Sequence, residues 1–128
     1  MQKNYIVSKS RERGVQMKEP TLGNPQNTIA VLQKYNFVFQ KKFGQNFLID
    51  THVLDKIIGS AEITKDDFVL EIGPGIGTMT QYLACAAGKV AAVEIDKALI
   101  PILEDTLDGY DNVQVINCLL YTSDAADD

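Results

Sequence analysis

A glycine loop between two short apolar runs constrains the fold of this chain more than any other feature. The first run, residues 68–72, leads into Gly-Pro-Gly-Ile-Gly, and a helix-like segment separates it from the second run at 90–94. Runs of this length are typical of buried strands. The pattern predicts a strand–loop–helix–strand unit. Its glycines, Gly73, Gly75 and Gly77, allow a tight turn and a close approach to a ligand, because no Cβ intervenes.

The spacing of the glycines separates two classes of nucleotide-type cofactor. A dinucleotide loop requires G-x-G-x-x-G, whereas this loop reads G-x-G-x-G and has Thr78 at the place of the third dinucleotide glycine. S-adenosylmethionine has no phosphate but has a sulfonium cation and two free ribose hydroxyls. Glu94, at the end of the second run, can accept both hydroxyls, and Glu71 adds negative charge near a cation. We therefore predict S-adenosylmethionine as the cofactor, the alternative being that both acids only cap strand ends.

Further helices and one more strand are expected around this unit. The pattern predicts helices capped by Thr28 and by Thr51, one from Thr78 to about residue 87, and one that begins just after Asp96 and ends at Gly109. A third strand is expected at 112–116. Strands that alternate with helices indicate an α/β fold, here the first half of a doubly wound, Rossmann-like sheet.

Charge is unevenly distributed along the 128 residues. The net charge is −5, yet residues 1–45 carry eight Lys or Arg and only two acids. This basic segment either contacts the phosphates of a nucleic acid or is a solvated leader. No apolar run approaches the roughly 18 residues of a membrane span, so a cytoplasmic protein without membrane contact is expected. Two cysteines, Cys85 and Cys118, give no metal-binding spacing, and no metal site is predicted.

Three ordered motifs carry a resemblance to a known family. Lys42-Phe-Gly-Gln-Asn-Phe-Leu48, Glu71-Ile-Gly-Pro-Gly-Ile-Gly-Thr78 and Val93-Glu-Ile-Asp96 together closely resemble the small-subunit ribosomal RNA adenine dimethyltransferases. The resemblance implies an enzyme that uses S-adenosylmethionine to dimethylate N6 of two adjacent adenines in small-subunit ribosomal RNA. It further implies that the parent protein acts as a monomer on ribosomal RNA in the immature small subunit.

The resemblance also implies which residues hold the cofactor. Asn46 and Leu48 would lie over its methionine end, Gly73 and Gly75 would line the loop, and Glu94 would hold the ribose. The sister family, the large-subunit adenine methyltransferases of macrolide resistance, usually has Lys and His where this chain has Ile76 and Thr78. This difference favours the small-subunit enzyme. A non-catalytic nucleotide- or RNA-binding module is the alternative from another class.

The resemblance divides the chain into four parts. Residues 1–21 are expected to be a disordered leader, with Met17 a possible true start, and residues 22–50 to be an N-terminal arm and cofactor-covering loop. Residues 51–117 are expected to be a partial methyltransferase domain. Residues 118–128 resemble translated sequencing adapter and are expected to be a non-native tail, the alternative being a natural acidic tail. The family's Asn-Leu/Ile-Pro-Tyr/Phe loop, which grips the target adenine, is absent from the sequence. We therefore assign no catalytic residue and expect the fragment to be inactive.

Overall fold

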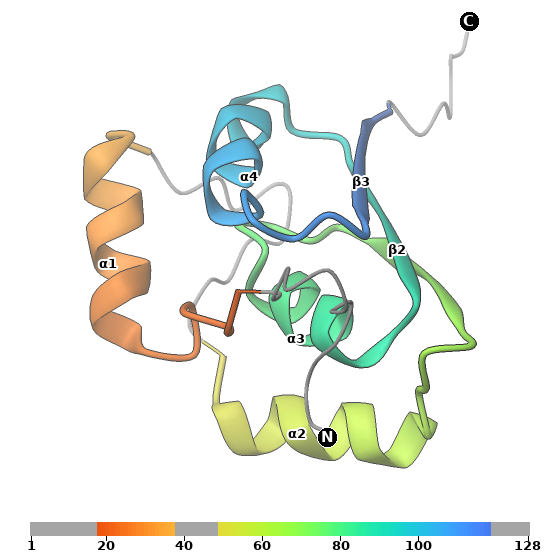
Figure 1. Cartoon of the computed structure of the whole chain (residues 1–128). Helices are drawn as coiled ribbons and strands as arrows, with labels where there is room; N and C mark the ends of the chain where they lie inside the picture. Colours follow the sequence, from red (N-terminus) through yellow and green to blue (C-terminus); the bar gives the residue numbers. More distant parts are fainter. Residues whose placement is uncertain (1–17, 38–48, 119–128) are drawn as a thin grey trace, which may run out of the picture.

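The computed structural model describes residues 18–37 and 49–118, which form helices on a small parallel sheet (Figure 1). The elements in chain order are α1 (Pro25–Lys34), α2 (Thr51–Ala61), β1 (Phe68–Ile72), α3 (Thr78–Ala86), β2 (Lys89–Glu94), the 3-10 turn η2 (Lys97–Leu99), α4 (Ile100–Thr106) and β3 (Val113–Asn117). The sheet has the order β1-β2-β3. The α/β class and the order of strands and helices predicted from the sequence are confirmed.

Each parallel strand pair is joined through a helix, as parallel pairing requires. β1 pairs with β2 from Phe68↔Lys89 to Ile72↔Val93, and β2 pairs with β3 from Val90↔Val113 to Glu94↔Asn117. In this register the carboxyl ends of the three strands lie at one edge of the sheet. Glu71, Glu94 and the glycine loop (residues 73–77) are therefore brought to the same edge.

One face of the sheet supplies the hydrophobic core. Alternate strand residues, Val69, Val90, Val113 and Val115, belong to a cluster that includes fully buried side chains of α4, Ile102 and Leu103. Helices α1, α3 and α4 lie on the same side of the sheet (Figure 1). The opposite face of β1 exposes Phe68, Leu70 and Ile72. Within the described part of the chain, the sheet is thus covered on one side only.

Two helix caps differ from those predicted. The N-cap of α1 is Asn24, whose side chain accepts from the N–H of Gln26, and not Thr28. The N-cap of α2 is Asp50, which accepts from the N–H of His52, and not Thr51. Thr, Asn and Asp can all cap a helix, and here Asn24 and Asp50 hold the position just before each helix. Thr28 instead lies inside α1, fully buried, and its hydroxyl donates to the Leu22 carbonyl at 3.3 Å.

Helix α2 buries less of its apolar face than the sequence indicates. Leu54 is fully buried and Ile58 packs against the core, whereas Val53 and Ile57 remain exposed. Amphipathic spacing identifies a helix and its apolar side. How many residues of that side are buried depends on the neighbouring elements.

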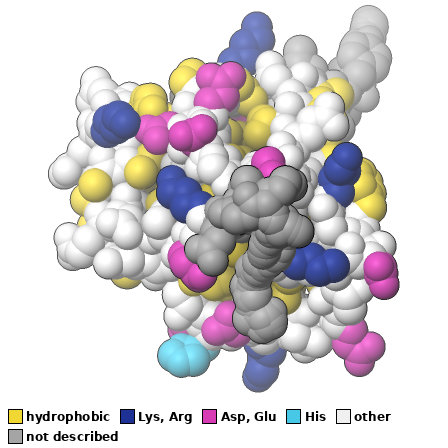
Figure 2. Space-filling view, viewed as in Figure 1, with side chains coloured by type: hydrophobic (Ala, Val, Ile, Leu, Met, Phe, Trp, Pro, Cys, Tyr) yellow, Lys and Arg dark blue, Asp and Glu magenta, His cyan; other side chains and the backbone are white. Residues whose placement is uncertain are grey.

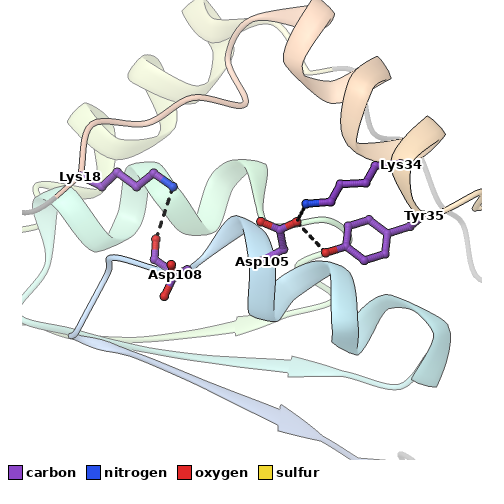
Figure 3. A network of polar contacts seen from close by, with 5 residues as sticks. All are labelled: Lys18, Lys34, Tyr35, Asp105 and Asp108. Atoms are coloured by element: carbon purple, nitrogen blue, oxygen red, sulfur yellow. Dashed lines mark hydrogen bonds and ion pairs between the residues drawn. The ribbon is translucent and has the colours of Figure 1, made fainter.

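The segment before α1 is hydrogen-bonded to the rest of the molecule. The Lys18 ammonium donates to the Asp108 carbonyl (Figure 3), and the Tyr110 hydroxyl donates to the Glu19 carbonyl at 2.8 Å. Lys18 and Glu19, near the end of the expected leader, are thus hydrogen-bonded to the segment that follows α4.

A second set of polar contacts holds the end of α1 against α4. Lys34 Nζ lies 2.7 Å from Asp105 Oδ2, and the Tyr35 hydroxyl donates to the same oxygen (Figure 3). Both contacts favour the ionised carboxylate, so they lower the pKa of Asp105 below its ordinary value. The carboxyl end of α1 is thus held against α4 by these polar contacts as well as by apolar packing.

Among the helices of residues 18–37 and 49–118, none has the length and apolar content needed to cross a membrane.

Candidate cofactor site at the carboxyl ends of the strands

The glycine loop adopts a conformation that side chains rarely allow. Gly73, Gly75 and Gly77 have φ angles of 74°, 63° and 98°. The loop is closed by hydrogen bonds from Gly73 N to Val93 O at 2.8 Å and from Gly77 N to Pro74 O at 2.9 Å. Left-handed φ values are strained for residues with a Cβ. The loop therefore requires glycine at three alternate positions, as the sequence pattern indicates.

Glu94 ties the end of β2 to this loop. Its Oε1 accepts from the N–H of Gly75 at 3.2 Å, its Oε2 accepts from the N–H of Asp96 at 2.9 Å, and the residue is only 4% exposed. The strand end is held in turn by Asn117, whose amide donates to the Glu94 carbonyl at 2.8 Å. A carboxylate can accept about four hydrogen bonds, so each oxygen keeps capacity for a ligand donor.

Glu71 lies at the end of β1 and is half-buried. Burial raises the pKa of its carboxyl above the ordinary value, and the negative charge of Glu94 raises it further. The hydroxyl of Thr80, on α3, donates to Glu71 Oε1 and opposes this rise. The two acids predicted at the strand ends are thus electrostatically coupled. A positive charge nearby would favour the ionised form of Glu71.

The outer glycines of the loop meet different surroundings. A Cβ built on Gly73 would have no atom within 4 Å, so open space lies in front of this residue. A Cβ built on Gly77 would come within 2.9 Å of Thr106 Oγ1 and 3.3 Å of Leu103 and Leu107 side-chain carbons. The close approach that Gly77 permits is therefore to α4, and not to a ligand.

Thr78, the first residue of α3, has surroundings that the sequence analysis did not anticipate. It is almost fully buried, and its hydroxyl oxygen has no hydrogen-bond partner among the described residues. Buried polar atoms are nearly always paired. The oxygen has almost no accessible surface, so the open space at Gly73 and the remaining acceptor capacity of Glu94 are the features that fit a polar ligand at the glycine loop.

Several predicted residues cannot be placed. Asn46 and Leu48, expected over the cofactor, lie outside the described residues, as do Lys41 and Lys42 of the basic segment. On the face seen in Figure 2, Lys side chains are dispersed among Asp and Glu and form no single-sign patch within the described residues. These same residues contain no cluster of three or more His, Cys, Asp or Glu that could hold a metal ion.

Comparison with known proteins places these features in a family. The family model described as ribosomal RNA adenine dimethylase matches residues 36–127. A ribosomal RNA small subunit methyltransferase A from Lachnoclostridium phytofermentans is 76% identical over 97 residues, which cover 75% of this chain and 33% of that protein. The chain thus spans about a third of the length of the curated relatives it matches.

Solved structures show the same arrangement of strands and helices. The 23S rRNA methyltransferase ErmE is similar with a TM-score of 0.54 and 40% identity, over 58% of this chain and 30% of that one. A dimethyladenosine transferase from Plasmodium falciparum is similar with a TM-score of 0.51 and 37% identity, over 56% of this chain and 26% of that one.

Proposed function

This chain belongs to the ribosomal RNA adenine dimethylase family, and from that premise we propose that it is the cofactor-binding part of a ribosomal RNA adenine N6-dimethyltransferase. The proposed cofactor is S-adenosylmethionine, which supplies a methyl group on a sulfonium cation. The proposed substrate is two adjacent adenines of small-subunit ribosomal RNA, within the immature small subunit. The parent protein is proposed to act in the cytoplasm as a monomer.

The cofactor proposal depends mainly on one observation: the Glu94 carboxylate is held in place at the glycine loop. This buried carboxylate is held by two backbone N–H groups, one of them from Gly75. It therefore has a fixed position and remaining acceptor capacity, which suit recognition of two ribose hydroxyls. Open space in front of Gly73 supports the same site. By the family resemblance, Asn46 and Leu48 complete it.

Charge at the site is compatible with the cationic part of the cofactor. Glu71 and Glu94 lie at neighbouring strand ends, and the charge of Glu94 raises the pKa of Glu71. A sulfonium nearby would offset this repulsion, because an opposite charge favours the ionised form of a carboxyl. The contribution of the described residues is therefore to bind and orient the cofactor and to balance its charge.

Two observations bear on which ribosomal RNA is the substrate. The 76% identical relative is named a small subunit methyltransferase, whereas the 40% identical ErmE is named a 23S rRNA methyltransferase. Ile76 and Thr78 differ from the Lys and His usual in the large-subunit resistance family. Both observations favour the small-subunit substrate.

The experiment is methyl transfer by the full-length protein that contains this chain. Immature small subunits and large-subunit ribosomal RNA are each incubated with S-adenosylmethionine, and dimethyladenosine is located by mass spectrometry of the digested RNA. Two adjacent dimethylated adenines in small-subunit RNA alone are expected. Modification of the large-subunit RNA instead would favour the resistance-type enzyme. Binding of RNA without methylation would favour a non-catalytic module.

A further inference from the structure

A buried chain of hydrogen bonds runs from the start of the described chain to the glycine loop. It has four members, from four separate segments: the backbone of Thr21 and Leu22, Gln81 in α3, Thr106 at the end of α4, and Ile76 in the loop. Gln81 is fully buried and Thr106 is 6% exposed. Polar side chains at such positions are costly unless each bond is made.

Thr106 makes the contact with the loop. Its hydroxyl donates to the Ile76 carbonyl at 2.7 Å. Ile76 lies between Gly75, which donates to Glu94, and Gly77, whose bare Cα faces Thr106 Oγ1. The hydroxyl thus holds the Ile76–Gly77 peptide, which lies between the proposed ribose-binding contact and the start of α3.

Gln81 holds Thr106 from the other side. Its Nε2 donates to the Thr106 carbonyl at 2.8 Å, and its Oε1 accepts from the N–H groups of Thr21 and Leu22, both at 2.9 Å. The Thr106 carbonyl lies in the last turn of α4, where helix carbonyls lack partners within the helix. Gln81 satisfies this carbonyl and fixes the helix end from which the Thr106 hydroxyl projects.

We propose that Thr106 is a positioning residue for the cofactor: its hydroxyl holds the glycine loop in the shape that binds S-adenosylmethionine, and Gln81 supports it. The inference rests on the proposed function, because it names a further determinant of the same site. Thr106 itself is not proposed to contact the cofactor or the substrate. By fixing the backbone of Ile76 and Gly75, it also fixes the Gly75 N–H group that donates to Glu94.

The test is calorimetric titration of S-adenosylmethionine into the full-length protein and three variants. Thr106→Val keeps the size of the side chain but leaves the Ile76 carbonyl without its donor, and about tenfold weaker binding is expected. Thr106→Ser keeps the hydroxyl and should bind within about twofold of the parent. Tyr110→Phe is the control, since it also removes a hydroxyl that donates to a backbone carbonyl, that of Glu19, but outside the chain of bonds that reaches the loop.

Steady-state kinetics distinguish positioning from a general loss of stability. Thr106→Val should raise the KM for S-adenosylmethionine, with kcat and the KM for RNA close to those of the parent. If Thr106→Val does not fold, the Thr106→Ala variant is titrated in its place, with folding checked by circular dichroism. Equal affinity of the parent and the folded hydroxyl-lacking variant would overturn the inference, as would an equal loss in Tyr110→Phe. If the parent itself binds no S-adenosylmethionine, the proposed function fails as well.

Discussion

At the scale of single residues, the two acids of the candidate site have different roles. Glu94 is held by two backbone N–H groups and is fixed for hydrogen bonding. Glu71 has one hydroxyl partner, Thr80, and its pKa is raised by burial and by the charge of Glu94. We therefore propose that Glu94 recognises the ribose and that Glu71 balances positive charge.

The raised pKa of Glu71 predicts a specific dependence of stability on pH. The folded protein binds the Glu71 proton at higher pH than the unfolded chain does, so this contribution to stability is fully present below the unfolded pKa. It is lost as pH rises through the raised folded pKa. In the full-length protein, the free energy of unfolding of the parent minus that of Glu71→Gln should increase as pH falls from about 7 to about 5. Urea titrations at several pH values measure this difference, and a constant difference would contradict the assigned environment of Glu71.

At the scale of elements, much of the arrangement could be predicted because it depends on local patterns. The residues of β1 are those predicted, β2 begins one residue earlier and β3 lies one residue later. Short apolar runs bounded by glycine or acids leave little choice of where a strand begins and ends. The predicted N-caps of α1 and α2 were wrong, because several residues able to cap a helix lie within a few positions of each helix start.

Other features could not be predicted because they depend on tertiary contacts. Gln81 and Thr106 are polar residues within helical patterns, where solvent exposure is the usual expectation. Their burial follows only from the packing of α3 against α4 and the preceding segment. Nothing in the glycine spacing shows that Gly77 faces α4 and not the ligand. The positions of Asn46 and Leu48 stay a prediction, and the site they would complete stays a proposal.

The contact between α1 and α4 predicts a local change on neutralising Asp105. Asp105→Asn removes the charge shared by Lys34 and Tyr35, so the carboxyl end of α1 should open more often. Trypsin cleavage after Lys34 in the full-length protein should become faster by about two- to fivefold, the range expected for a surface ion pair. Mass spectrometry of early fragments measures the rate at this bond.

Asp108→Asn is the matched control for this change. Lys18 bonds to the backbone carbonyl of Asp108, so replacing that side chain should leave cleavage after Lys34 unchanged. The difference between the two variants should shrink in about 1 M salt, where exposed charges are screened. Equal cleavage rates in both variants at low salt would show that the ion pair does not fasten α1.

At the scale of the whole molecule, the described residues form half of a two-sided fold. Parallel sheets are normally covered on both faces, yet Phe68, Leu70 and Ile72 are 64%, 59% and 58% exposed. These side chains lie on β1, which is also an edge of the described sheet. An apolar edge strand of this kind favours association between chains.

The exposed face predicts the behaviour of the 128-residue chain expressed alone. It should be largely insoluble or molten and transfer no methyl group to ribosomal RNA, because burial in so small a core barely offsets the entropy of the chain. Leu70→Lys should raise the soluble fraction by about twofold or more, since an edge charge opposes pairing. Centrifugation and thermal unfolding measure both outcomes. A soluble parent chain that unfolds cooperatively and methylates adenine would contradict this prediction.

The most direct test of the account is calorimetric titration of S-adenosylmethionine into the full-length protein and its Glu94→Ala and Gly75→Val variants. Glu94→Ala strands the N–H groups of Gly75 and Asp96 and removes the ribose acceptor, so binding should weaken by about 1–3 kcal/mol. Gly75→Val should weaken it at least as much, because a branched side chain is strained at a φ of 63° and would lie against the ligand. Glu104→Ala, at an exposed acid of α4, is the control and should bind as the parent does. Affinity unchanged in both site variants would contradict the assignment of this loop to the cofactor.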